Sequence, residues 1–163
     1  MEKQTKAITR QLTHPLKSRI FLLSKLPSAF FTGVRIRDVD EKKCRVTVPY
    51  NWFSKNPFHS IYFACLGMAA EMSTGVLCMI HLYYRKPPVS MLVVKVEGDY
   101  FKKATDKTIF ICEDGEKIEN AIDEAILSGE ARTIRAKSTG TNKNGELVAT
   151  FYITWSFKVK SKK

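Results

Sequence analysis

The sequence predicts an α+β fold in which a long central helix is wrapped by a curved antiparallel sheet, with an N-terminal helix and one inserted short helix. Residues from about Ser60 to Tyr83 are apolar on nearly every face and rich in small side chains, so a helix there has to be enclosed by the rest of the chain. Most of the chain after that helix has the pattern of strands, and Asn144-Gly145 is a strong hairpin signal. A sheet folded around the helix satisfies both this order and the enclosure.

Composition favours one domain over residues 1–163. The chain is 163 residues long, 44% hydrophobic and 11% aromatic, which is enough for a core, and neither a linker nor a repeat divides it. Its 27 Lys+Arg against 16 Asp+Glu give a net charge of +11. The sequence lacks a nucleic-acid-binding motif, a glycine-rich phosphate loop and a zinc-type cysteine pattern, so we expect no nucleic-acid partner, no cofactor and no metal.

The first residues lack the apolar core of a secretion signal, and the four cysteines show no disulfide framework. We therefore expect a cytoplasmic protein with reduced thiols. Residues 61–84 are long enough to cross a bilayer, but Glu71 lies at their centre, where a carboxylate would be costly in lipid. The sequence thus predicts a buried helix and no membrane span.

The segment before the central helix reads as helix followed by strands. An apolar period near 3.6 runs from Lys6 to Leu26 and is interrupted at Pro15, which predicts one or two short helices within an N-terminal helical segment, residues 1–30. Residues 33–50 alternate as two short strands or one bent hairpin, and residues 51–58 form a loop.

After the central helix, the pattern predicts four strands and one more helix. The helix covers residues 114–129, with Asp114 as its N-cap and Gly129 as its stop. A basic tail, residues 158–163, ends the chain. The strands are expected at residues 89–96, 108–112, 130–138 and 147–159.

Residues 56–75, NPFHSIYFACLGMAAEMSTG, resemble the loop and central helix of hotdog-fold thioesterases. The resemblance is greatest to the largely uncharacterised thioesterase-like branch that carries a Glu on the helix. Outside this stretch, the resemblance lies in the order of the elements, which covers most of the chain. The residues at matching spacings are Asn56, Ser60, Tyr62, Glu71 and Gly75.

The resemblance implies a homodimer, often paired into a tetramer, that binds an acyl-CoA or other thioester between subunits. By matching position, Glu71 would activate water or attack the thioester carbonyl, and Ser60 and Ile61 would supply the backbone N–H groups at the helix start. His59 stands where the family pattern has glycine, so a side chain there could crowd the thioester or donate a proton. The site residues implied are Glu71, Asn56 and His59 for catalysis, and Ser60, Ile61, Tyr62 and Gly75 for substrate binding.

Physical chemistry independently supports a role for this helix in acyl transfer. Burial raises the pKa of a carboxyl group such as Glu71, which suits it to act as a base, and a helix N-terminus suits a developing oxyanion. Glu71 lies about three turns, ~16 Å, from Ser60 on one helix. Because both cannot meet one carbonyl, a partner subunit has to bring its own helix start alongside.

Other interpretations remain open from the sequence alone. In the alternative interpretation of Glu71, it is a structural acid hydrogen-bonded to Ser73, Thr74 or a residue of a facing strand. In the alternative interpretation of His59, it is a cap or interface residue. The leading functional hypothesis is an acyl-CoA thioesterase; the alternatives are a non-catalytic acyl-CoA- or lipid-binding hotdog protein and, last, a basic nucleic-acid-associated protein.

Overall fold

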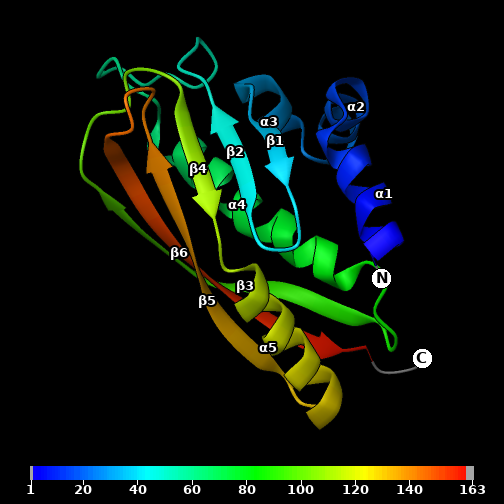
Figure 1. Ribbon diagram of the computed structural model, residues 1–163. Helices are drawn as coiled ribbons and strands as arrows, with labels where there is room; N and C mark the ends of the chain where they lie inside the picture. Colours follow the sequence, from blue (N-terminus) through cyan, green and yellow to red (C-terminus); the bar gives the residue numbers. More distant parts are fainter. Residues whose placement is uncertain (1, 161–163) are drawn as a thin grey trace.

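A computed structural model describes residues 2–160, and in it one antiparallel sheet curves around helix α4 (Phe63–Leu82) (Figure 1). The strand order is β1-β2-β4-β5-β6-β3, so β1 and β3 are the two edges. This is the hotdog fold, and the predicted fold class is confirmed. The strands are β1 (Arg35–Val39), β2 (Cys44–Val48), β3 (Val89–Tyr100), β4 (Thr108–Cys112), β5 (Arg132–Thr141) and β6 (Leu147–Val159).

Helix α4 is enclosed as its composition predicted. Its length and hydropathy would suffice for a membrane span, but most of its apolar stretch is buried against the sheet. The few polar side chains on the buried face are hydrogen-bonded: Ser73 Oγ lies 2.8 Å from Ser138 Oγ, and the indole N–H of Trp155 donates to Thr74 Oγ1 at 2.9 Å. Small residues such as Ala69 and Ala70, both fully buried, let the strands approach closely.

The segment predicted to form one or two helices forms two, α1 (Glu2–Thr13) and α2 (Pro15–Lys25), which are divided at Pro15 as expected. A third helix, α3 (Pro27–Thr32), follows them and was not predicted. Pro15 and Pro27 each occupy the first turn of a helix, where a missing N–H costs nothing. The sequence pattern missed α3 because six residues are too short to show a helical period. Helices α1 and α2 pack against β1, whereas α3 packs against α2 and α4 (Figure 1).

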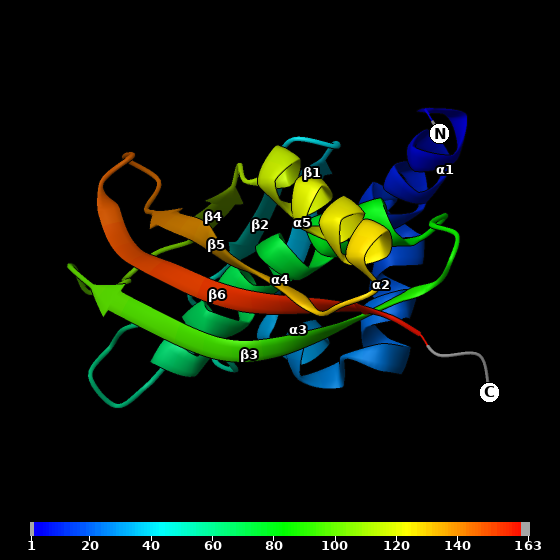
Figure 2. The same ribbon diagram turned by 90° about the horizontal axis from the view of Figure 1, so that it is seen from below.

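Strand β3 is longer than predicted because it pairs with β6 along its whole length, from Val89 opposite Val159 to Tyr100 opposite Ala149. The pattern placed its end at Val96, before Gly98. A Cβ on Gly98 would lie 2.8 Å from the Phe151 ring, so glycine is needed there for the two strands to pack. Figure 2 shows β3 along the free edge of the sheet.

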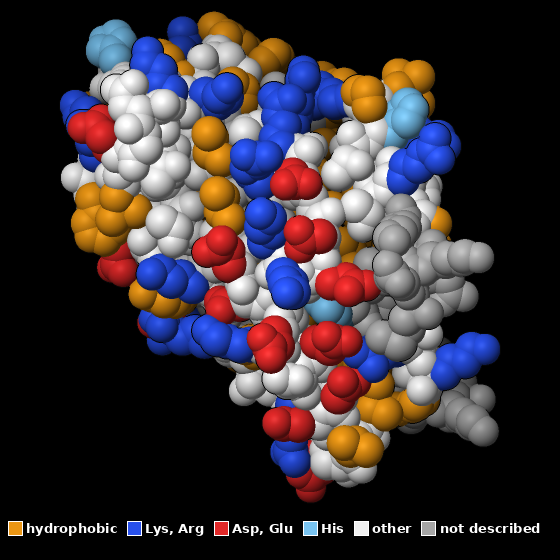
Figure 3. Space-filling model, viewed as in Figure 1, with side chains coloured by type: hydrophobic (Ala, Val, Ile, Leu, Met, Phe, Trp, Pro, Cys, Tyr) orange, Lys and Arg blue, Asp and Glu red, His pale blue; other side chains and the backbone are white. Residues whose placement is uncertain are grey.

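Helix α5 (Gly115–Ser128) packs against α4 and β5, and Gly129 ends it with a φ of 71° as predicted. The predicted side-chain cap is wrong: Asp114 accepts from the Lys137 N–H at 2.7 Å and from Lys117 Nζ at 2.6 Å, and from none of the backbone N–H groups at the start of α5. Acidic side chains gather over α5, whereas lysines, arginines and apolar groups occupy the opposite end of that face (Figure 3).

All four cysteines are free and buried. Cys44 of β2 lies directly opposite Cys112 of β4, and burial raises the pKa of the Cys112 thiol to about 12. Of the predicted basic tail, Lys158 belongs to β6, and residues 161–163 lie outside the described residues.

Candidate functional site

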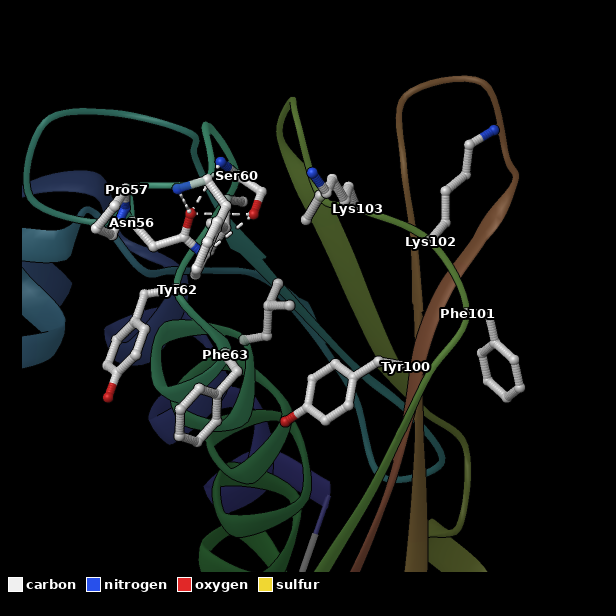
Figure 4. A pocket seen from close by; sticks show the side chains of 13 residues that line it. Asn56, Pro57, Ser60, Tyr62, Phe63, Tyr100, Phe101, Lys102 and Lys103 are labelled. Carbon is white, nitrogen blue, oxygen red and sulfur yellow. Dashed lines mark hydrogen bonds between the residues drawn. The ribbon is translucent and has the colours of Figure 1, made fainter.

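A pocket of about 600 Å³ opens beside the start of α4, between the loop before the helix and the segment after β3 (Figure 4). Its walls are mostly apolar and aromatic, as ligand sites usually are. It brings together four of the residues that the sequence singled out, Asn56, Ser60, Ile61 and Tyr62. The other lining residues are Pro57, Phe58, Phe63, Leu66, Tyr100, Phe101, Lys102, Lys103 and Ala104.

The Asn56 side chain organises the loop that forms one wall. Its Oδ1 accepts from the N–H groups of Phe58 at 3.0 Å and Ser60 at 3.2 Å, and its Nδ2 lies 3.1 Å from Ser60 Oγ. His59 lies outside the pocket lining and has a φ of 57°, in the region that favours glycine. A glycine would adopt this φ without strain, whereas His59 adopts it with a side chain.

The helix starts at Phe63, three residues later than the pattern placed it. The N–H of Ile61 donates to Ala104 O at 2.8 Å, and that of Ser60 donates to Asn56, so neither is free to polarise a carbonyl. The helix-start N–H groups without an acceptor among residues 2–160 belong to Phe63 and Ala64. The predicted donors, Ser60 and Ile61, are thus corrected to these two.

The last residue of β3 and the residues that follow it form the opposite wall, and sequence reasoning missed them. In Figure 4 the Tyr100 ring points toward Phe63, while Lys102 and Lys103 stand at the mouth with their amines outward. Burial raises the pKa of the Tyr100 phenol. The Tyr-Phe-Lys-Lys run at the end of the strand could have indicated this wall, since aromatic and basic groups are adjacent in it.

Glu71 and Gly75 lie together in a second, smaller pocket of about 90 Å³ between α4, α2 and β3. A Cβ on Gly75 would sit 3.1 Å from Glu71 Oε1 and 3.2 Å from Trp155 Cζ2, so glycine leaves room for the carboxyl group. Apart from Glu71 the lining is almost entirely apolar, and consists of Leu12, Phe21, Leu22, Leu26, Ile36, Met72, Gly75, Val76, Met79 and Met91.

The Glu71 carboxylate is half-buried, and desolvation raises its pKa. It has neither a hydrogen-bond nor an ion-pair partner within the part of the chain that the structure describes. The predicted alternative of a structural acid held by Ser73 or Thr74 is wrong: Thr74 Oγ1 donates to the backbone carbonyl of Glu71 at 2.9 Å, and Ser73 bonds to Ala70 and Ser138.

The structure thus divides the predicted site into two pockets. Phe63 and Glu71 are eight residues apart on one straight helix, which separates the free N–H groups from the carboxylate by ~12 Å. One chain alone cannot bring both to one carbonyl carbon. Among residues 2–160, no cluster of three His, Cys, Asp or Glu side chains could hold a metal ion.

Solved structures with the same fold include several bacterial proteins. PA5026 from Pseudomonas aeruginosa, described as a probable thioesterase, is 18% identical, with 92% of this chain and 99% of that chain covered and a TM-score of 0.76. A protein of unknown function from Chlorobaculum tepidum, OLEI01261, is also 18% identical over 92% and 99% of the chains, with a TM-score of 0.74. Thioesterase HI1161 from Haemophilus influenzae is 12% identical over 85% and 87%, with a TM-score of 0.64.

At these identities the likeness establishes the fold alone. No curated protein sequence matches the chain. The family model described as Domain of unknown function (DUF4442) matches residues 18–157, which includes the pocket at the helix start, every lining residue of the Glu71 pocket except Leu12, and every strand up to the last residues of β6. The chain therefore belongs to the DUF4442 family.

Proposed function

We propose that this protein is a thioesterase that hydrolyses an acyl-CoA or a similar thioester, with Glu71 as general base or nucleophile. The observation that carries the proposal is a half-buried carboxylate with a raised pKa, unpaired among the described residues, in an apolar pocket. A carboxylate in such surroundings is costly to maintain and is well suited to accept a proton. The thioesterases among the solved structures of the same fold support the same chemistry.

We further propose that the active form is a homodimer joined along β3. This strand is 12 residues long and has a free edge, which natural proteins usually cover or interrupt. Val96 is paired with the fully buried Ile153 and faces the helix side of the sheet, yet it is 52% exposed. Phe63 and Tyr100 on the same side are also about half exposed. A second copy would cover these apolar groups.

Antiparallel pairing of two β3 strands along their whole length would bring the two kinds of pocket together. It would set Val89 opposite Tyr100 of the partner subunit and Met91 opposite Gly98 of the partner subunit. Met91 lines the Glu71 pocket, and Tyr100 lines the pocket at the helix start. Each composite site would then hold Glu71 of one chain and the free N–H groups of the other.

In this site the acyl group would enter the apolar pocket beside Glu71. The N–H groups of the partner subunit's Phe63 and the partner subunit's Ala64 would donate to the thioester oxygen as negative charge develops there. As base, Glu71 would take a proton from the water that attacks the carbonyl carbon; as nucleophile, it would form an anhydride that water then opens. In both routes the C–S bond breaks, and a thiol and a carboxylic acid leave.

Two lysines at the mouth favour a carrier with negative charge. Lys102 and Lys103 lie on the wall at the end of β3; Lys102 is paired with Glu146 at 2.5 Å, whereas Lys103 has no ion-pair partner among the described residues. The phosphates of coenzyme A are suited to such a rim, because exposed ammonium groups attract phosphate without needing a fixed geometry. The small size of the Glu71 pocket favours a short acyl group.

The helix-start donors can be tested by removing one N–H. Phe63→Pro deletes this donor at the first helical position, where proline fits, since Tyr62 before it is extended with ψ 134°. We expect kcat to fall by about 10²–10³-fold, as for loss of one oxyanion donor. Phe63→Ala, which loses the ring but keeps the N–H, is the matched control and is expected to retain most of kcat. Equal losses in the two variants would argue against the donor role.

Mixing two inactive variants tests whether the site is composite. In a heterodimer of Glu71→Gln and Phe63→Pro, one of the two sites would be built entirely from unaltered groups. Random exchange of subunits should therefore restore about a quarter of the wild-type activity, given a symmetric dimer with two sites. If both groups served one carbonyl within a single chain, mixing would restore nothing.

The close approach at Gly75 predicts a further activity effect. Gly75→Ala adds a methyl group 3.1 Å from Glu71 Oε1 and 3.2 Å from Trp155, so the carboxyl group has to shift. We expect kcat to fall by about 10²-fold, the effect of misplacing a reacting group by roughly 1 Å. Gly67→Ala on the same helix, where the nearest atom would be 3.4 Å away, is the control and should leave kcat within a few-fold.

Binding of acyl-CoA without release of thiol by the wild-type protein would instead support a non-catalytic binding protein.

A further inference from the structure

A third pocket, of about 110 Å³, lies between the junction of α1 and α2 and the edge strand β1. It is separate from the two pockets of the proposed active site, although Ile36 lines both this pocket and the Glu71 pocket. Three of its seven lining residues are arginines. The lining residues are Thr13, Pro15, Ser18, Arg19, Arg35, Ile36 and Arg37.

Two of these arginines, Arg35 and Arg37, lie on the edge strand β1. The pairing of β1 with β2 shifts between Ile36 and Asp38, which leaves Arg37 as the extra residue of a β-bulge. Bulges redirect side chains and are common beside functional sites. Arg37 Nε donates to Thr47 Oγ1 at 3.0 Å, which holds one side of its guanidinium and leaves its terminal nitrogens free of protein acceptors among the described residues.

Arg19 approaches the same pocket from α2. Its guanidinium stacks on the Phe30 ring, 3.7 Å from the centroid, and one terminal nitrogen donates to Phe30 O at 3.2 Å. The other terminal nitrogen is buried and has no acceptor among the described residues. A buried guanidinium nitrogen without an acceptor is costly, so an anion in the pocket would satisfy it.

The charges around this pocket are unbalanced. No carboxylate among the described side chains lines it, and Asp38, the nearest acid along β1, pairs with Arg45 at 3.6 Å. Burial and the neighbouring Arg35 both lower the pKa of Arg19. Like charges gathered in one place destabilise a fold unless an opposite charge joins them.

We propose that this pocket is a binding site for a phosphate group, held by Arg19, Arg35 and Arg37. Guanidinium groups bind phosphate oxygens in pairs, and the Ser18 hydroxyl in the lining adds another donor. The proposal is independent of the thioesterase activity, because it uses no residue assigned to that site.

A phosphate group could arrive on a soluble ester or on the head group of a membrane lipid. Beside Arg19, the outer face of α2 exposes Leu16, Ile20 and Leu23, which would suit contact with lipid. Both sources share the same recognition chemistry, and the experiment separates them.

The test measures binding of inorganic phosphate, glycerol 3-phosphate and vesicles to the full-length protein at constant ionic strength. We expect phosphate, but not chloride at the same ionic strength, to raise the melting temperature of the wild type. Arg35→Gln with Arg37→Gln should weaken phosphate binding by about 100-fold, roughly tenfold for each charge-assisted hydrogen bond lost. The matched control, Lys42→Gln with Lys43→Gln, removes the same charge from the exposed turn after β1 and should bind like the wild type.

Vesicles of phosphatidylcholine, with or without an equimolar amount of phosphatidic acid, identify the source. Co-sedimentation only with phosphatidic acid, lost in the arginine double variant, would assign a lipid head group; tight binding of glycerol 3-phosphate without co-sedimentation would assign a soluble ester. If the double variant does not fold, Arg35→Gln and Arg37→Gln alone should each weaken binding about tenfold. Absence of binding to every probe, or equal weakening in the lysine control, would overturn the proposal.

Discussion

Replacement of Glu71 by glutamine is expected to lower kcat for thioester hydrolysis by about 10²–10⁴-fold, the range for loss of a general base. The amide keeps the size and shape of the side chain but accepts a proton poorly. Steady-state release of free thiol from a panel of acyl-CoAs measures the effect. Glu116 of α5 is exposed and lines neither pocket. Glu116→Gln is therefore the matched control and should retain wild-type kcat. Full activity of Glu71→Gln would remove Glu71 from the mechanism.

The raised pKa of Glu71 also predicts how activity depends on pH. The base has to be ionised, so kcat should rise as pH increases through a pKa above the ordinary value of about 4.3 for glutamate. The ascending limb of the pH profile should be absent in Glu71→Gln. A limb at the same pH in both proteins would assign that ionisation to another group.

As pH rises, the contribution of Glu71 to folding stability should fall while the activity rises. Because the folded-state pKa of Glu71 is raised, the folded protein keeps a proton at pH values where the unfolded chain has already released it. The contribution of Glu71 to folding stability is therefore most favourable below about pH 4.3 and is lost as pH rises through the folded-state pKa. Glutamine does not ionise. Glu71→Gln should therefore melt at a higher temperature than the wild type at pH 8, and the difference should shrink in acid.

Val96→Lys is expected to convert the proposed dimer to monomers and to abolish most of the activity, with Glu71 intact. The side chain is half exposed in the isolated chain, so the monomer tolerates a charge there, whereas a dimer joined along β3 would bury it. Burying an unpaired charge costs about 3–5 kcal/mol, which raises the dissociation constant by roughly 10²–10⁴-fold. Light scattering after gel filtration measures the mass.

A control for that variant is available on helix α5. Leu127 of α5 is 86% exposed, so Leu127→Lys adds the same charge without touching β3. It should leave both the mass and the activity as in the wild type. A monomeric wild type with full thioesterase activity would contradict the composite site, although the fold would stand.

The hotdog architecture could be predicted because its signals are local. The enclosed helix shows itself as an apolar run crowded with small residues, and the Asn144-Gly145 hairpin and the Gly129 stop depend on backbone conformations that glycine favours. The exact helix start could not be predicted. Ser60 and Ile61 are held out of the helix by Asn56 and by Ala104, a residue more than forty positions away.

The site was predicted in part for the same reason. Glu71 and Gly75 stand one helical turn apart, so their proximity follows from the sequence. Tyr100 and Lys103 reach the helix start only because β3 runs on past Gly98, and that extension depends on its pairing with β6. The arginine pocket likewise joins α2 to β1, and neither element alone indicates it.

Chemical modification of the four buried thiols can report on the opening of the folded core. Cys44 and Cys112 sit face to face inside the sheet, with Cys78 on the helix beneath, and burial keeps the pKa of each above its ordinary value. A thiolate reagent can therefore reach them only when the strands part from the helix. The rate of their modification should follow the unfolding of the core, and a ligand that binds the folded state should slow it in proportion to its occupancy.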